Sequence, residues 1–84
     1  MFHGEPSART RRLPPDVLRT ARRKLDMINA ATSLADLRSP PANRLERLRG
    51  DLAGQHSIRV NDQWCIVFLW TNGEAHQVRL LDYH

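Results

Sequence analysis

Residues 64–74, with the sequence WCIVFLWTNGE, decide the fold of this 84-residue chain. The apolar run 64–70 predicts a central strand that a helix covers on one side and that is partly sheltered on the other. Asn72-Gly73 predicts a tight hairpin turn, because both central residues of such a turn need a positive φ. We expect a last strand over about 75–82 and an earlier, half-buried strand over 57–60, where polar and apolar residues alternate. The sequence therefore predicts a three-stranded antiparallel meander.

Two helical segments are expected before the meander. Pro14-Pro15-Asp16 places proline at a helix start with an acid in the first turn, and apolar residues recur at every third or fourth position up to Ile28. This pattern predicts a helix over about 15–31. Thr32 to Asp36 combines capping residues with an acid, and Pro40-Pro41 prevents continuation. A second helix of one to two turns is therefore predicted as a short connector.

The length of the chain admits one domain, because a chain of 84 residues buries only about 60 to 65% of its unfolded surface. We therefore predict a single α+β domain over residues 1–84, with helices packed on a small antiparallel sheet. Residues 1–13 carry no apolar periodicity and are expected to form an exposed loop or tail.

The chain carries a formal charge of +4, and Lys24 is the only lysine among its thirteen basic residues. Guanidinium groups form a planar fork that matches phosphate, so an arginine-rich chain suggests a polyanion binder. A GC-rich genome is the alternative explanation. The single cysteine, Cys65, excludes an internal disulfide. The sequence has no metal-ligand spacing, so we expect no metal site. Because it also has no apolar run of about 18 residues and no signal-peptide pattern, we expect a cytoplasmic protein without a membrane segment.

Four stretches together are specific enough to suggest a family: LRSPPANRL (37–45), LRGD (48–51), SIRVNDQW (57–64) and LDYH (81–84). In these stretches the chain resembles the HigB-type killer toxins of the RelE superfamily, which belong to bacterial type II toxin–antitoxin systems. The resemblance covers nearly the whole chain and implies a RelE-like fold. In that fold a short first strand and a helix precede the segment seen here, so we expect both to be missing before Met1.

The resemblance also implies a function. Such toxins cleave messenger RNA on the ribosome without a metal or another cofactor, and thereby inhibit translation. The ribose 2′-hydroxyl attacks the adjacent phosphate in line, which requires a base, an acid and cations that stabilise the phosphoryl oxygens. The implied partners are the ribosome, mRNA and a cognate helical DNA-binding antitoxin. Operator DNA would be contacted only through the antitoxin, and no membrane is involved.

The terminal Asp82-Tyr83-His84 matches the final Asp-Tyr-His of the family, so the resemblance implies that these three residues are catalytic. Strand alternation would place Asp82 and His84 on one face, where an imidazole can exchange protons near neutral pH and a carboxylate can orient it. Tyr83 would either stack on a base or pack on the sheet. The alternative is that the triplet is only a solvated tail.

Two further residues complete the implied catalytic set. Arg49 stands where relatives have a basic residue before Gly-Asp and is the first candidate for phosphate stabilisation, with a solvated surface arginine as the alternative. Glu46 stands where some relatives have His, and is either a general base or only a salt-bridge partner of Arg44 or Arg47. Cys65 stands where relatives commonly have Arg, and losing a guanidinium from a phosphate site removes about 2 to 4 kcal/mol of transition-state stabilisation. We therefore also consider a catalytically weakened relative that acts as an antitoxin-binding, operon-regulating module.

Other basic residues are candidates for RNA contact, on the solvent-facing side of the predicted helix and in the segments after it: Arg19, Arg22, Arg23, Lys24, Arg44, Arg47 and Arg59. His56 and His76 lie on strands away from the terminal triplet, and we interpret both as structural or surface residues. Trp64, Phe68 and Trp70 share one strand face and are predicted to pack on the helix rather than to stack on bases. A plain nucleic-acid-binding domain has little support, because no helix-turn-helix, zinc or RNP-type pattern occurs.

Overall fold

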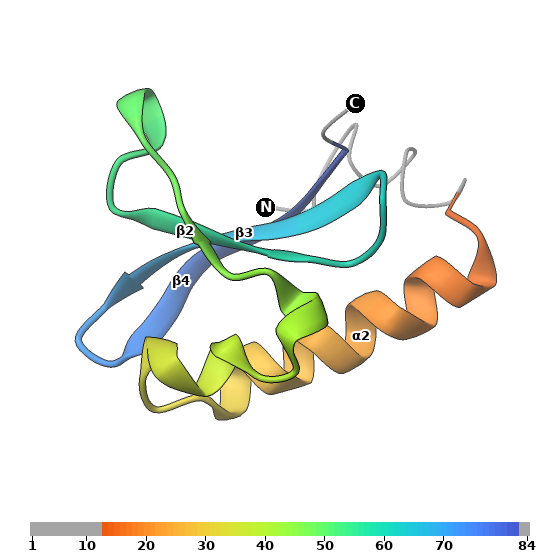
Figure 1. Cartoon of the computed structure of the whole chain (residues 1–84), viewed down its shortest axis with the longest axis horizontal. Coiled ribbons are helices and arrows are strands. Elements are labelled where there is room, and N and C mark those ends of the chain that lie inside the picture. Colours follow the sequence, from red (N-terminus) through yellow and green to blue (C-terminus); the bar gives the residue numbers. More distant parts are fainter. Residues whose placement is uncertain (1–12, 83–84) are drawn as a thin grey trace.

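The computed structural model describes residues 13–82 and shows one α-helix packed against one face of a four-stranded antiparallel sheet (Figure 1). The helix, α2, spans Pro15–Ala30. The strands lie side by side in chain order: β1 Glu46–Arg47, β2 Gln55–Arg59, β3 Trp64–Thr71 and β4 Glu74–Asp82. Three 3₁₀ helices occupy the connections: η1 Leu34–Arg38, η2 Pro41–Asn43 and η3 Gly50–Leu52. The predicted α+β class is confirmed.

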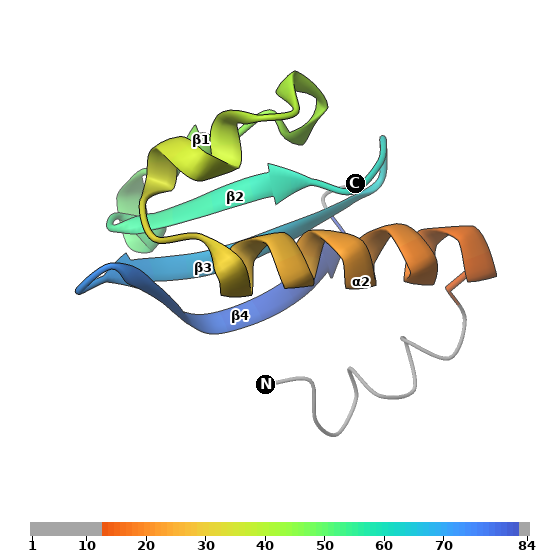
Figure 2. The same ribbon diagram turned by 90° about the horizontal axis from the view of Figure 1, so that it is seen from below.

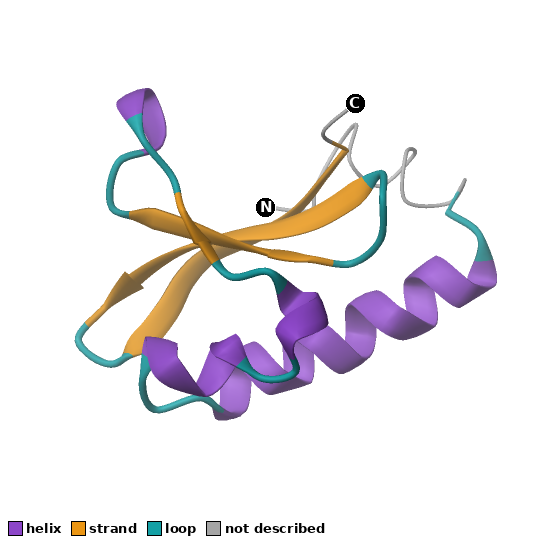
Figure 3. Ribbon diagram, in the orientation of Figure 1, coloured by secondary structure: helices purple, strands orange, loops and turns teal. Residues whose placement is uncertain are grey.

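The layers are visible when the molecule is turned. Figure 2 shows α2 in front of the sheet, across β3 and β4, with β1 at the opposite edge next to β2. Figure 3 shows that the short helices leave much of the other sheet face without a helical cover. The site described below lies on that uncovered face.

The predicted meander is confirmed for β2, β3 and β4, but the count of three strands was wrong. Strand β1 adds a fourth strand, in which Glu46 pairs with Ser57 and Arg47 pairs with His56. A two-residue strand with both side chains exposed carries no alternation, so the sequence pattern does not reveal it. Its place in the sheet comes from pairing with β2.

The β3–β4 hairpin follows the predicted turn and then departs from regular pairing. Asn72 and Gly73 have φ of 55° and 78°, as the tight turn requires. Val67 pairs with Arg79 and Leu69 pairs with His76, so two residues of β4 stand opposite the single residue Phe68. This β-bulge places Gln77 at a positive φ of 53°.

The core lies between α2 and the sheet. Ile28 of α2 packs with Ile58, Ile66 and Phe68, all of which are almost fully buried. Burying one such side chain contributes about 1.5 to 3 kcal/mol. The predicted helix is thus confirmed, and the predicted packing of the β3 aromatics on it is supported by a buried Phe68, with Trp70 packed edge-on against it.

A second cluster corrects the expectation for the start of the chain. Leu13 is only 6% exposed and packs with Val17 and Trp64, so it belongs to the core rather than to an exposed tail. The side chain extends the apolar stripe of α2 by one residue beyond the prolines. Residues 1–12 lie outside the described part of the chain.

Lys24 was wrongly placed on the solvent-facing side of the helix. Its side chain is 6% exposed, because position 24 follows Val17 by seven residues and precedes Ile28 by four, on the buried stripe of α2. The Lys24 Nζ donates a hydrogen bond to Oδ1 of Asn43, which is fully buried in η2. Asn43 Nδ2 in turn donates to the Leu37 carbonyl at 3.1 Å. A charged residue on the buried stripe therefore links α2 to the chain that leads into β1.

Candidate active site

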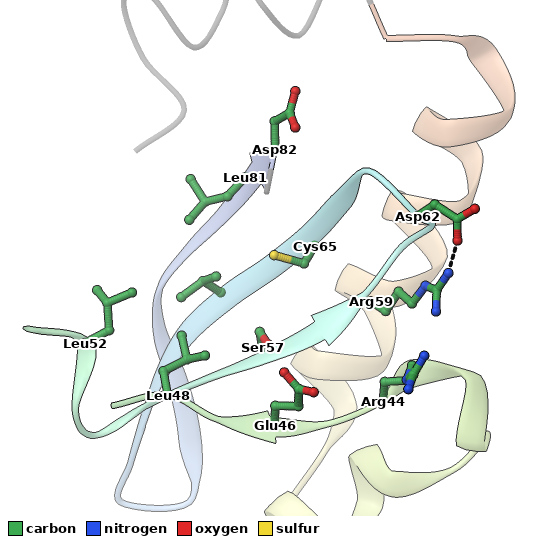
Figure 4. Close-up of a pocket in the computed structure, with 11 residues that line it drawn as sticks. Arg44, Glu46, Leu48, Leu52, Ser57, Arg59, Asp62, Cys65, Leu81 and Asp82 are labelled. Atoms are coloured by element: carbon green, nitrogen blue, oxygen red, sulfur yellow. Dashed lines mark hydrogen bonds and ion pairs between the residues drawn. The ribbon is translucent and has the colours of Figure 1, made fainter. Parts of the chain in front are cut away.

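A cavity of about 500 Å³ lies on the sheet face opposite α2 (Figure 4). Its floor is formed by two cross-strand pairs of β2 and β3, Ser57 with Val67 and Arg59 with Cys65, whose side chains point away from the helix. We call it the sheet cavity, and its complete lining is Arg44, Glu46, Leu48, Leu52, Ser57, Arg59, Asp62, Cys65, Val67, Leu81 and Asp82.

The sheet cavity has an apolar end and a charged end. Figure 4 shows Leu48, Leu52 and Leu81 on one side, and Arg44, Arg59 and Asp62 on the other. Leu52 and Leu81 are the large apolar residues with the most exposure in the described chain, at 36% and 37%. Such a lining suits a ligand that joins an apolar ring to a charged group.

Two predicted catalytic residues line the sheet cavity at opposite edges of the sheet. Glu46 belongs to β1 and Asp82 to β4, and these are the two outer strands. Three inter-strand spacings separate the outer strands by roughly 14 Å. Glu46 pairs with Ser57 and shares its cavity-side face. Asp82 pairs with Trp64 on the α2 side, and Figure 4 shows its carboxylate pointing away from the cavity. Asp82 stands at the rim and accepts a hydrogen bond from Gln63 Nε2 at 3.0 Å. Tyr83 and His84 lie outside the described residues, so their predicted roles stay predictions.

Two arginines supply the positive charge of the sheet cavity. Arg59 of β2 forms an ion pair with Asp62 across the β2–β3 turn. Arg44 follows η2 and adopts the left-handed conformation with φ of 48°, while its backbone N–H donates to the Pro41 carbonyl at 3.0 Å. The helical turn before it and the strand after it thus fix the point from which Arg44 reaches the cavity. Both residues were predicted to contact RNA.

Arg49 does not line the sheet cavity. It lies in a separate hollow that it shares with Arg47 and Glu46, so Glu46 borders both spaces. Among residues 13–82 the ion pairs are Arg59–Asp62 and His76–Glu74, and Glu46 takes part in neither. Of the two alternatives for Glu46, the salt-bridge partner of Arg44 or Arg47 is therefore not the arrangement that the structure has.

Cys65 lies on the floor of the sheet cavity and is half-buried. Burial raises the pKa of its thiol, and the nearby Glu46 carboxylate raises it further. The thiol is therefore neutral near pH 7 and adds no charge to the site. A cation at this position would stand beside Glu46 and directly across from Arg59.

The other predicted residues lie away from the sheet cavity. Arg19 and Arg22 are exposed on α2, and Arg23 and Lys24 line a separate hollow described below. His56 stacks on Phe68 with ring centroids 6.1 Å apart, and burial together with Arg47 lowers its pKa, in keeping with a structural role. Within residues 13–82, no helix is long and apolar enough to cross a membrane, and no cluster of three or more His, Cys, Asp or Glu could hold a metal ion.

Several cavity residues were missed by the sequence reasoning: Leu48, Leu52, Ser57, Asp62 and Leu81. Ser57 carried a usable signal, because it alternates with Ile58 and therefore faces away from the core. The three leucines carried none, because an apolar residue in a basic segment predicts core packing as readily as a ligand surface.

A sheet with a helix on one face and a cavity with two arginines on the other defines a small α+β protein with a charged site. Its sequence matches the family of HigB-like toxins, described as RelE-like toxins of type II toxin–antitoxin systems, over residues 2–84. The chain belongs to this family, which confirms the resemblance and the RelE-like fold. A toxin of this type has an antitoxin partner.

Three relatives match over most of this chain. An uncharacterized protein of Haemophilus influenzae is 44% identical over 69 residues, which cover 82% of this chain and 68% of the relative. Toxin HigB-1 of Vibrio cholerae is 44% identical over 71 residues, or 84% of this chain and 75% of the relative. Endoribonuclease HigB of Proteus vulgaris is 36% identical over 61 residues, or 73% and 65%.

Proposed function

We propose that this toxin is an endoribonuclease that cleaves mRNA on the ribosome without a metal, and that the sheet cavity is its active site. The name of the Proteus vulgaris relative, an endoribonuclease, supports the reaction class. We further propose that a helical antitoxin with a DNA-binding domain neutralises the toxin in the cytoplasm, and that operator DNA is reached only through this partner.

The observation that carries the proposal is that Glu46 and Asp82 line one cavity at opposite edges of the sheet. In-line attack needs a base on the 2′-oxygen side of phosphorus and an acid on the side of the leaving 5′-oxygen. A phosphodiester that lies across β2 and β3 meets this requirement. Glu46 accepts the 2′-hydroxyl proton, and His84, oriented by Asp82, protonates the 5′-oxygen. The products are a 2′,3′-cyclic phosphate and a free 5′-hydroxyl.

Charge on the phosphoryl oxygens is stabilised by arginine. Arg44 and Arg59 line the cavity itself. Arg49 lines the neighbouring hollow, which shares Glu46 with the cavity. Guanidinium donors placed on developing negative charge typically contribute about 10² to 10³ in rate each. Arg59 has to exchange its partner Asp62 for the phosphate. The apolar end formed by Leu48, Leu52 and Leu81 takes the adjacent base.

The test is cleavage of a reporter mRNA in a reconstituted translation system, with new 5′ ends mapped by primer extension. Glu46→Gln should lower the cleavage rate about 10²-fold or more, because it removes the base. Arg59→Gln should lower it by a similar factor, and Arg38→Gln, an exposed arginine outside the cavity, should leave it unchanged. Intact mRNA after incubation of translating ribosomes with the wild-type toxin would contradict the proposal.

A second candidate function is favoured by Cys65. The neutral thiol occupies the floor of the sheet cavity, where a guanidinium would add to phosphate stabilisation. In this case the protein is a catalytically weakened toxin that binds its antitoxin and tunes transcription of the operon. Absence of cleavage by the wild-type protein, together with retained capture of the antitoxin and cleavage restored by Cys65→Arg, would identify this function.

A further inference from the structure

A second hollow lies between α2, η2 and the end of β2, and four cations line it. Arg23 and Lys24 come from α2, Arg44 follows η2, and Arg59 ends β2. We call it the basic hollow; its other lining residues are uncharged: Thr20, Pro41, Ala42, Val60 and Asn61. Within the described part of the chain, no carboxylate lines it.

The basic hollow adjoins the sheet cavity. Arg44 and Arg59 line both spaces, so these two residues form the border that the two share. Figure 4 shows these two side chains together at the charged end of the sheet cavity, on the side where α2 passes. An elongated ligand that extends out of the sheet cavity at this end would therefore reach the basic hollow.

The positive charge of the basic hollow is only partly compensated. Asp62 pairs with Arg59, but its side chain is largely exposed and does not line the basic hollow. The Lys24 ammonium carries three N–H donors, and in the described chain one acceptor, Asn43 Oδ1, receives a hydrogen bond from it. Burial and the neighbouring Arg23 both lower the pKa of Lys24, which means that the folded protein disfavours this charge. An anion in the hollow would offset that cost.

We propose that the basic hollow is a phosphodiester-binding subsite for single-stranded RNA, and that it holds a phosphate flanking the one in the sheet cavity. The inference rests on the proposed function, which places RNA in the sheet cavity. Arginine forks bind phosphate oxygens with two parallel hydrogen bonds, and a buried ammonium supplies a point charge beneath them. Inorganic phosphate presents the same oxygens as RNA, but it lacks the ribose-phosphate backbone that would connect the basic hollow with the sheet cavity.

The experiment measures fluorescence anisotropy with labelled 2′-O-methyl oligoribonucleotides, which cannot be cleaved because the 2′-oxygen lacks its proton. A hexanucleotide, which reaches both sites, should bind more tightly than a dinucleotide. Arg23→Gln should weaken hexanucleotide binding about tenfold, lower the slope of log affinity against log salt by about 0.7, and leave the dinucleotide unaffected. Arg38→Gln removes the same charge outside the hollow and should change affinity by less than about twofold.

Three results would overturn the subsite. Equal effects of Arg23→Gln and Arg38→Gln on the hexanucleotide would show that only net charge matters. Arg23-dependent binding of inorganic phosphate, with no advantage of the longer oligonucleotide, would identify a free-phosphate site. Unchanged hexanucleotide binding by Arg23→Gln, together with weakened antitoxin capture, would identify a protein-docking surface.

The failure of this inference and that of the proposed function are distinguishable, because the binding assay contains no ribosome and no cleavable bond. If the wild-type toxin binds the hexanucleotide in an Arg23-dependent way but leaves mRNA intact, the subsite is supported and the nuclease proposal fails. If the wild-type toxin cleaves mRNA but the Arg23→Gln variant binds the hexanucleotide normally, the nuclease proposal is supported and the subsite fails.

Discussion

Cys65 connects the chemistry of the sheet cavity with a property that can be measured directly. The thiolate, not the thiol, reacts with alkylating agents. Burial and the Glu46 carboxylate raise the thiol pKa above its ordinary value of 9.0, so alkylation by iodoacetamide should be slow at neutral pH and should reach half its maximal rate above pH 9. Glu46→Gln removes the repelling charge and should increase the rate at pH 8 several-fold.

The matched control for this experiment is Glu74→Gln, which removes a carboxylate at the start of β4, where it pairs with His76 rather than facing Cys65. Equal rates for the two variants would mean that Glu46 does not act on the thiol, and therefore that it is not directed into the cavity. This would also weaken its assignment as the general base.

At the scale of an element, the turn between α2 and η1 depends on one carboxylate. Asp36 accepts hydrogen bonds from the backbone N–H groups of Thr32 at 2.9 Å and Ser33 at 3.2 Å, and these lower its pKa below 3.8. A depressed pKa in the folded state stabilises the protein above the unfolded value of 3.8, and the contribution is lost as pH falls through the folded pKa. Asp36→Asn should therefore lower the Tm at pH 7 but not in strong acid.

Circular dichroism melts between about pH 2 and pH 7 test this expectation. Asp26→Asn, which neutralises an exposed carboxylate on α2, serves as the control and should show little change in Tm. A constant difference in Tm between Asp36→Asn and the wild type over the whole range would mean that the charge of Asp36 has no part in fixing the turn.

At the scale of the whole molecule, local sequence patterns predict the helix and the strands, whereas the pairing register of the strands produces the site. The apolar run of β3 and the Asn72-Gly73 turn are local features, and both predictions are confirmed. The sheet cavity arises because Arg59 pairs with Cys65 and Glu46 pairs with Ser57. These registers depend on non-local pairing and on a two-residue strand, so no periodicity in the sequence predicts them.

The Lys24–Asn43 hydrogen bond is the non-local feature with the clearest consequence for stability. It joins the middle of α2 to η2, immediately before the segment that carries Arg44 and Glu46. Removing one partner of a buried hydrogen bond costs about 1 to 3 kcal/mol, because the other partner is left unsatisfied. Asn43→Ala should be the more destabilising change, since it leaves a buried ammonium without its acceptor and also frees the Leu37 carbonyl.

A double-mutant cycle measures this link, with urea unfolding followed by the fluorescence of Trp64 and Trp70. Lys24→Met keeps most of the packing volume and removes the charge. The double variant Lys24→Met/Asn43→Ala should lose less stability than the sum of the single variants, by about 0.5 to 3 kcal/mol. Additive losses would mean that the two residues stabilise the fold independently. In that case α2 would not determine where the chain enters β1, and the position of Glu46 in the sheet cavity would depend on pairing with β2 alone.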